Sequence, residues 1–204
     1  MSDNNSVLGT EGGPANRPFS NNGIFSGGGR KNAAEDVSNN TITIHGLRTS
    51  NGGGWSMIYG GVSGTGAVTG NKVIFNHGTS ADALVGGYTG ATDKDVRGNS
   101  VTVADGTIKD DIIGGWAGVA AGTGTLAENT VAITGGTIGS YDGGIVYGAR
   151  TSGNGVLKNN TVSFANASTS RAVYGAATDD TNSTATLRGN SVTITSGTIN
   201  SPVA

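Results

Sequence analysis

The sequence predicts an all-β fold, a parallel β-solenoid (β-helix) of about six coils with a period near 30 residues. Three observations support this: a phrase that recurs six times, a glycine-rich composition, and the absence of helical spacing over any ten-residue window. Each repeat is too short and too polar to bury a core alone. The repeats are therefore expected to stack into one continuous structure.

The recurring phrase is an aliphatic residue, two further residues, an asparagine, a small or polar residue, and two apolar positions separated by one residue. Its first copy, VSNNTITI, runs from Val37 to Ile44. The asparagines are spaced 31, 28, 30, 31 and 30 residues apart, at Asn40, Asn71, Asn99, Asn129, Asn160 and Asn190. We expect their amides to stack and to form a hydrogen-bonded ladder along the axis.

The segment after each asparagine alternates apolar and polar residues, which is typical of a half-buried strand. The apolar members are the expected inward pairs of the core: Ile42/Ile44, Val73/Phe75, Val101/Val103, Val131/Ile133, Val162/Phe164 and Val192/Ile194. Glycine corners such as Gly106 and Gly136 follow them. Each coil is thus predicted to be three short strands joined by corners.

A glycine-rich template with one large ring forms the second landmark of each repeat. It is interpreted as Ile58-Tyr59-Gly60-Gly61, Val85-Gly86-Gly87-Tyr88, Ile113-Gly114-Gly115-Trp116, Val146-Tyr147-Gly148-Ala149 and Val173-Tyr174-Gly175-Ala176. Its second and fourth positions lie on the same side of a strand. We therefore predict an outward aromatic strip: Phe25, Tyr59, Tyr88, Trp116, Tyr147 and Tyr174. The rings either cover glycine backbone or form a contact surface for sugars or a neighbouring protein.

The two ends divide the chain into a non-repeat N-terminal arm (residues 1–22), the β-solenoid (residues 23–200) and a C-terminal tail (residues 201–204). The repeats begin and end within a unit, and the two partial units are complementary. We therefore predict head-to-tail association into a homopolymer. The arm either clasps the neighbouring subunit by strand addition or folds over the first coil of its own chain.

Composition argues against several classes of partner. The formal net charge is −2, and lysines and arginines are scattered, so no nucleic-acid partner is expected. The chain has no cysteine, which excludes disulfides and thiolate metal sites. Residues 1–22 lack the pattern of a signal peptide, and no segment is apolar enough for membrane insertion.

Acidic and histidine residues offer the only candidate chemistry, and we expect no enzyme, no metal and no cofactor. Asp82, Asp110 with Asp111, and Asp142 fall near one corner of three successive coils. They suit a solvated corner better than a weak calcium site or the carboxylates of a glycosidase. His45 and His77 precede corner glycines without a third ligand. Arg97, Lys158 and Arg188 share a register beside the asparagines.

The repeat phrases resemble those of large bacterial autotransporter-type and related surface proteins. Residues 129–138 (NTVAITGGTI) and 58–61 (IYGG) carry the resemblance, which covers roughly residues 23–200. It implies an extracellular or cell-surface β-helix with a structural or adhesive role, such as a subunit of a surface fibre or adhesin stalk. The partners it implies are further copies of the chain, a surface glycan, or a host or neighbour-cell protein.

Two alternatives stay open. One is a carbohydrate-binding or polysaccharide-cleaving β-helix protein, since parallel β-helices also carry those functions. The other is an ice-binding surface of outward threonines, which Lys72 and Ile74 interrupt.

Overall fold

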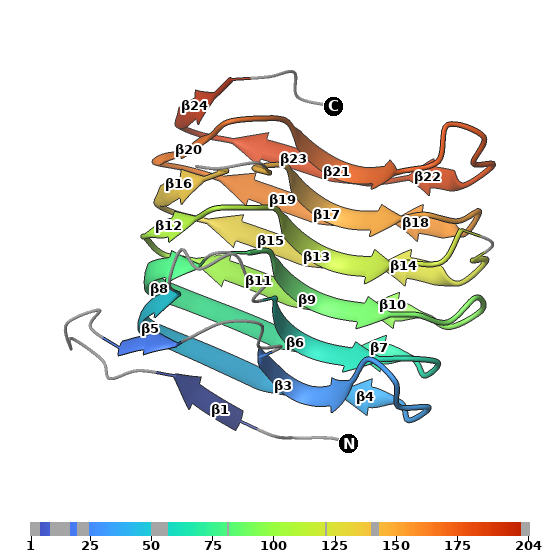
Figure 1. Cartoon of the computed structure of the whole chain (residues 1–204). Coiled ribbons are helices and arrows are strands. Elements are labelled where there is room, and N and C mark those ends of the chain that lie inside the picture. The colour runs from blue at the N-terminus through green and yellow to red at the C-terminus, as the bar shows by residue number, and fades with distance from the viewer. Residues whose placement is uncertain are drawn as a thin grey trace.

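The computed structural model describes residues 5–8, 17–19, 25–49, 57–80, 82–120, 122–139 and 143–200. Within these residues there are 24 β-strands and no helix. The strands stack as successive coils, with β1 (Asn5–Leu8) at one end and β24 (Gly197–Ile199) at the other (Figure 1). The predicted all-β parallel solenoid is confirmed.

Three parallel sheets run along the stack. Sheet A contains β4 (Val37–Ser38), β7 (Val68–Thr69), β10 (Val96–Arg97), β14 (Thr125–Ala127), β18 (Val156–Lys158) and β22 (Thr186–Arg188). Sheet C contains β3 (Phe25–Arg30), β6 (Ile58–Ser63), β9 (Leu84–Thr89), β13 (Ile112–Ala117), β17 (Val146–Thr151) and β21 (Val173–Thr178).

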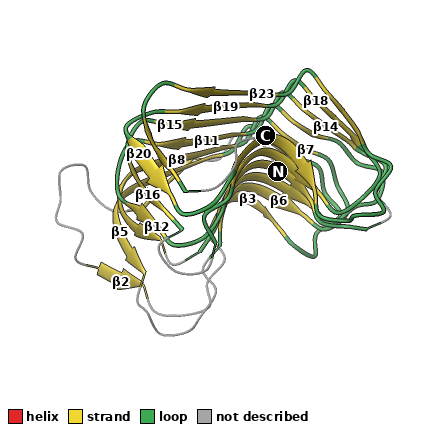
Figure 2. Cartoon of the chain, turned by 90° about the horizontal axis from the view of Figure 1, so that it is seen from above, coloured by secondary structure: helices red, strands yellow, loops and turns green. Residues whose placement is uncertain are grey.

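Sheet B holds the strands that follow the asparagines, together with those after the glycine corner. Besides β1 and β24 it contains β2 (Arg17–Phe19), β5 (Thr41–Thr49), β8 (Lys72–Ser80), β11 (Ser100–Val103), β12 (Thr107–Ile108), β15 (Thr130–Ile133), β16 (Gly136–Ile138), β19 (Thr161–Phe164), β20 (Ala167–Thr169) and β23 (Ser191–Ile194). A coil passes from sheet C to sheet A to sheet B, as the view along the stack shows (Figure 2).

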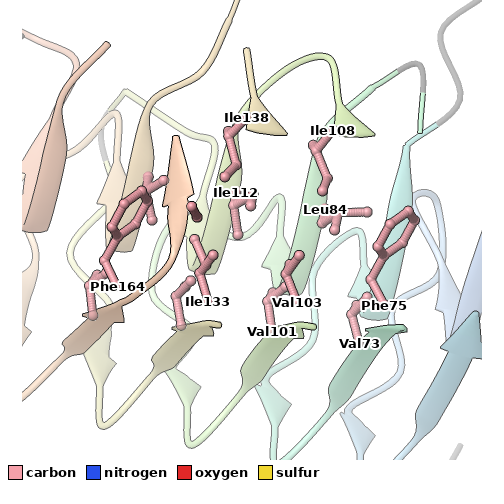
Figure 3. Close-up of a cluster of buried hydrophobic side chains, with 14 of the residues drawn as sticks. Val73, Phe75, Leu84, Val101, Val103, Ile108, Ile112, Ile133, Ile138 and Phe164 are labelled. Carbon is pink, nitrogen blue, oxygen red and sulfur yellow. The ribbon is translucent and has the colours of Figure 1, made fainter. Parts of the chain in front are cut away.

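The main core lies between sheets B and C (Figure 3). Val73 and Phe75 of β8 face Leu84 of β9, and the same arrangement recurs from coil to coil. The inward pairs predicted for the first five copies of the phrase are all at most 2% exposed. Ile108 and Ile138, from the short strands after the corner, close the core on its third side.

The turn between sheets A and B explains which residue types precede the ladder asparagines. Gly70, Gly98 and Gly189 have φ between 61° and 67° there, and Asn39 and Asn159 have φ of 57° and 55°. Glycine and asparagine are the residues that adopt this left-handed conformation most readily. The same place in the fourth copy holds Glu128, at φ 58°.

The asparagine ladder is present as predicted. Each Nδ2 donates to the Oδ1 of the asparagine in the next coil at 2.8 to 3.1 Å, through the whole series Asn40, Asn71, Asn99, Asn129, Asn160 and Asn190. The first five are fully buried. A Cβ at Gly87 or Gly115 of sheet C would lie 2.5 Å from the Cγ of Asn99 or Asn129. The glycines are therefore required by the ladder.

The described strands of the N-terminal arm join the solenoid of their own chain. β1 pairs in parallel with the first half of β5, and β2 with its second half. Of the two alternatives for the arm, these strands adopt the fold over the first coil of their own chain, because their backbone partners lie in β5. The stack extends to the N-terminal side of residue 23.

Candidate functional site

The first candidate site is the aromatic strip, and its register differs from the sequence prediction. Tyr59 pairs with Val85, and the same column continues through Ile113, Tyr147 and Tyr174. Tyr88 and Trp116 lie in a second column, which runs from Gly29 of β3 through Val62 and continues to Arg150 and Ala177. Tyr59 and Val62 are three residues apart yet pack in one cluster, because a Gly-Gly pair separates them. The rings thus occupy two adjacent columns.

Phe25 does not belong to the strip. It pairs with Ile58, whereas Ser26 pairs with Tyr59. Its side chain packs against the main core between sheets B and C. The correct frame of the N-terminal repeat is therefore one residue later than the sequence suggested.

The remaining five rings form a nearly continuous series on the outer side of sheet C. The ring centroids of Tyr59 and Tyr88 are 5.9 Å apart, and those of Tyr88 and Trp116 are 4.9 Å apart. Tyr147 and Tyr174 stack at 5.6 Å. Arg150 links the two groups, since its guanidinium lies 5.4 Å from the ring of Trp116 and 5.2 Å from that of Tyr147.

Much of this strip is a second, smaller core. Tyr59 is 0% exposed and Tyr147 is 6% exposed, whereas Tyr88, Trp116 and Tyr174 are partly exposed. Burial raises the pKa of the Tyr88 hydroxyl and raises that of Tyr147 to about 12. Only the three partly exposed rings are available to a contact partner.

Arg150 is the electrostatic centre of the strip, and sequence reasoning did not identify it. Its Nε donates to Asp179 at 2.7 Å and its Nη1 to Asp111 at 3.3 Å. Asp111 also accepts the backbone N–H groups of Gly144 and Ile145. Arg150 occupies the position in the second column that Trp116 has one coil earlier. This shared register is the sequence signal that could have drawn attention to Arg150.

The structure brings three of the four candidate aspartates into electrostatic contact, while Asp142 lies outside the described residues. Burial, followed by the charge of Asp111, raises the pKa of Asp110 to about 6, and Asp82 adds to the increase. Arg150 opposes it. The described residues contain no group of three His, Cys, Asp or Glu side chains placed to hold a metal ion.

The basic residues share the predicted register, whereas the two histidines become partners only through a register shift. His45 and His77 are register partners in β5 and β8, beyond a register shift, and Asn76 Nδ2 lies 3.0 Å from His45 Nδ1. Lys158 and Arg188 are neighbours in sheet A, whereas Ala127 separates Arg97 from Lys158.

The second candidate site is the C-terminal end of the stack. Leu187 of β22 and Ile194 of β23 are 45% and 41% exposed, and no other large hydrophobic residue whose side chain the structure describes is so exposed. Asn190 accepts the ladder bond of Asn160 and donates to the carbonyl of Leu157. Among the described residues no further coil lies above it.

The described residues contain no helix long and apolar enough to cross a membrane. Comparison of the chain with protein-family models, with curated proteins and with solved structures finds no match. The resemblance of the repeats to autotransporter-type surface proteins stays a hypothesis.

Proposed function

We propose that the protein is a structural, non-enzymatic solenoid of the bacterial cell surface, a subunit of a fibre or adhesin stalk that lengthens end to end. The observation that carries this proposal is the uncovered C-terminal coil. Its strands β21 to β24 repeat the pattern of the coils below, but nothing in the described chain covers them.

The apolar residues of this coil favour a further coil above them. Leu187 and Ile194 correspond to Leu157 and Phe164 one coil below, which are 0% and 1% exposed. Covering them would contribute about 1 to 2 kcal/mol for each side chain. The free edges of three parallel sheets would gain backbone hydrogen bonds at the same time.

The ladder gives such growth a direction. Each ladder asparagine from Asn40 to Asn160 donates its amide to the asparagine on its C-terminal side. Asn190 already donates to the Leu157 carbonyl of its own chain. Its ladder partner would be an Oδ1 at the N-terminal end of another stack, whereas two C-terminal ends would bring donor against donor. The resulting head-to-tail contact does not close, and it gives an open filament.

The surface location rests on the repeat resemblance. Tyr88, Trp116 and Tyr174, together with Arg150, provide partly exposed rings and a cation where a glycan or a neighbour-cell protein would bind. A glycan array tests for a sugar partner. We expect the wild-type protein to bind and the Trp116→Ala variant to lose that binding.

Assembly is tested with two substitutions on adjacent residues. Ile194→Asp places a charge on the face expected to be covered, whereas Thr193→Asp places it on the outward face of the same strand. We expect filaments of the wild type and of Thr193→Asp in negative-stain electron microscopy, and monomers of Ile194→Asp with a nearly unchanged Tm. A wild type that stays monomeric at high concentration, or an Ile194→Asp variant that assembles normally, contradicts the proposal.

A further inference from the structure

β1 and β2 occupy the place that the C-terminal strands of a second copy would take. β1 lies beside β5 in the register Asn5 with Thr41 through Leu8 with Ile44. In every higher coil that place belongs to the strand after a ladder asparagine, and β23 is the last of these strands. Continuing the register would set Ser191 of one copy against Thr41 of the next.

The sequence of β1 fits this place less well than the sequence of β23. Ile42 and Ile44 have Val73 and Phe75 as their register partners in β8, and Ser6 and Leu8 in β1. The position of Ser6 is apolar and β-branched in every other strand of the column: isoleucine in β5, and valine in the strands above it, at Val73, Val101, Val131, Val162 and Val192. β2 carries Pro18, which has no N–H to donate to a ladder. β23 and β24 would therefore be better partners of β5.

Charges at the two ends of the stack match in the same register. The column that begins at Arg30 of β3 ends at Thr178 of β21. Lys31 thus corresponds to Asp179 of the neighbouring copy, and the exposed Arg30 would lie over Thr178, diagonally opposite Asp179 and Asp180. Likewise Ser38 corresponds to Arg188 in sheet A, which places Arg188 diagonally opposite Asp36. Both juxtapositions are attractive.

The connections of the chain also agree with this arrangement. A stack ends with β21, β22, β23 and β24 in sheets C, A, B and B, and β3, β4 and β5 would continue that order in sheets C, A and B. A second copy can add these three strands in sequence only if its own β1 and β2 no longer lie below β5. Two strands cannot share one edge.

We infer that β1 and β2 are an internal plug, and that the edge of β5 they cover is the acceptor surface for β23 and β24 of a second copy of this chain. This inference rests on the proposed end-to-end assembly. A tethered strand competes at an effective concentration on the order of millimolar, so the plug holds the chain monomeric until subunits are concentrated or a first stack nucleates growth.

The first test removes residues 1–22. Deletion is expected to lower the concentration needed for assembly by about tenfold or more, measured by light scattering and electron microscopy. The filaments should have an axial rise of about 29 Å per subunit, from six strands in each of sheets A and C at about 4.8 Å each. A folded deletion variant that assembles less readily than the full chain overturns the inference.

The second test fixes the plug in the full-length chain, so that it does not depend on the folding of a truncated one. The chain has no cysteine, and Asn5 and Thr41 are register partners, so Asn5→Cys with Thr41→Cys introduces one specific disulfide. Oxidation should abolish assembly and reduction should restore it. Assembly that is equal in the oxidised and reduced states overturns the inference.

The third test reads the register directly. A Thr41→Cys deletion variant mixed with a Ser191→Cys full-length chain should form a disulfide-linked dimer, whereas the same mixture with Thr193→Cys should form much less. If Ile194→Asp blocks assembly but the Ser191–Thr41 link never forms, the stacking proposal stands and the plug is wrong. If no variant assembles and no link forms, both are wrong.

Discussion

The two ends of the solenoid carry the same strand phrase in different surroundings. Ile42 and Ile44, in the first copy, are 1% and 0% exposed, with β1 on one side of their strand and β8 on the other. Val192 is only partly buried in the last copy, and Ile194 is 41% exposed. The comparison teaches that the phrase specifies a strand and its register, while the neighbouring coil supplies the burial.

The largest difference between a central coil and the last coil is expected when a charge is introduced at matched inward positions. Val131 is 1% exposed in a central coil, and Val192 occupies the same column in the last coil. Val131→Asp buries an unpaired carboxylate and should cost more than about 4 kcal/mol, enough to unfold the stack. Val192→Asp should cost about 1 to 2 kcal/mol. Urea denaturation followed by circular dichroism measures both, and equal losses would contradict the assigned inward face.

The outer side of sheet C offers a second matched pair. Tyr59 is fully buried, whereas Tyr174 of the last coil is partly exposed. Tyr59→Ala should cost about 3 to 4 kcal/mol, because a large cavity forms between packed rings. Tyr174→Ala should cost about 1 kcal/mol, the value of one exposed stacked pair. Thermal unfolding measures the Tm of both variants. A Tyr59→Ala protein as stable as wild type would mean that the ring of Tyr59 lies on an open surface.

The ladder allows the same comparison for hydrogen bonds. Asn129 accepts from the amide of Asn99 at 3.0 Å and donates to Asn160 at 3.0 Å and to the Val96 carbonyl at 2.9 Å. Asn129→Ala should cost about 3 kcal/mol, since buried partners are left unsatisfied. Asn190→Ala should cost about 1 kcal/mol, because solvent reaches the last coil. Urea titration of both variants, with unchanged m-values, checks the difference.

The smallest effect comes from the acidic corner, away from both ends. The pKa of Asp110 is raised from 3.8 to about 6 by burial and by Asp111, so the folded chain keeps this proton while the unfolded chain loses it. The free energy of unfolding should therefore fall as the pH rises through that window, by about 1 kcal/mol after solvent screening. Asp110→Asn should remove this dependence and raise the Tm at neutral pH. A pH profile of Tm that is identical for the two proteins would be evidence against the burial of this carboxyl.

The fold was predictable because one period controls every level of the structure. The asparagine spacing gives the coil length, and the alternation after each asparagine gives the inward face. The left-handed corner before the ladder was not predicted, although Gly70, Gly98 and Gly189 precede three of the ladder asparagines and could have indicated it. Alternating polarity cannot show that Tyr59 and Val62, three residues apart, pack in one cluster. The strip was therefore expected in one column, and Phe25 was misplaced by one residue. Aligning the Gly-Gly pairs, which lie against the ladder, recovers the correct frame.

The candidate sites were less predictable, because they depend on contacts outside the repeat. Arg150 stands where the preceding coil has a ring in the same column. That one difference in residue type cannot reveal that its guanidinium lies between two rings and two carboxylates. The pairing of β1 was hidden by distance: Asn4, outside the described residues, precedes Asn5 as Asn40 precedes Thr41, but the interval of 36 residues exceeds the period.

The constant register of the three sheets also has a mechanical consequence. Backbone hydrogen bonds between coils run along the stack, so tension between its two ends would act on one coil at a time. The exposed C-terminal coil, with the least buried surface, should peel first. Each coil of 28 to 31 residues would release about 100 Å of extended chain. As part of a stalk, such a solenoid would lengthen in steps under load and re-form when the load falls.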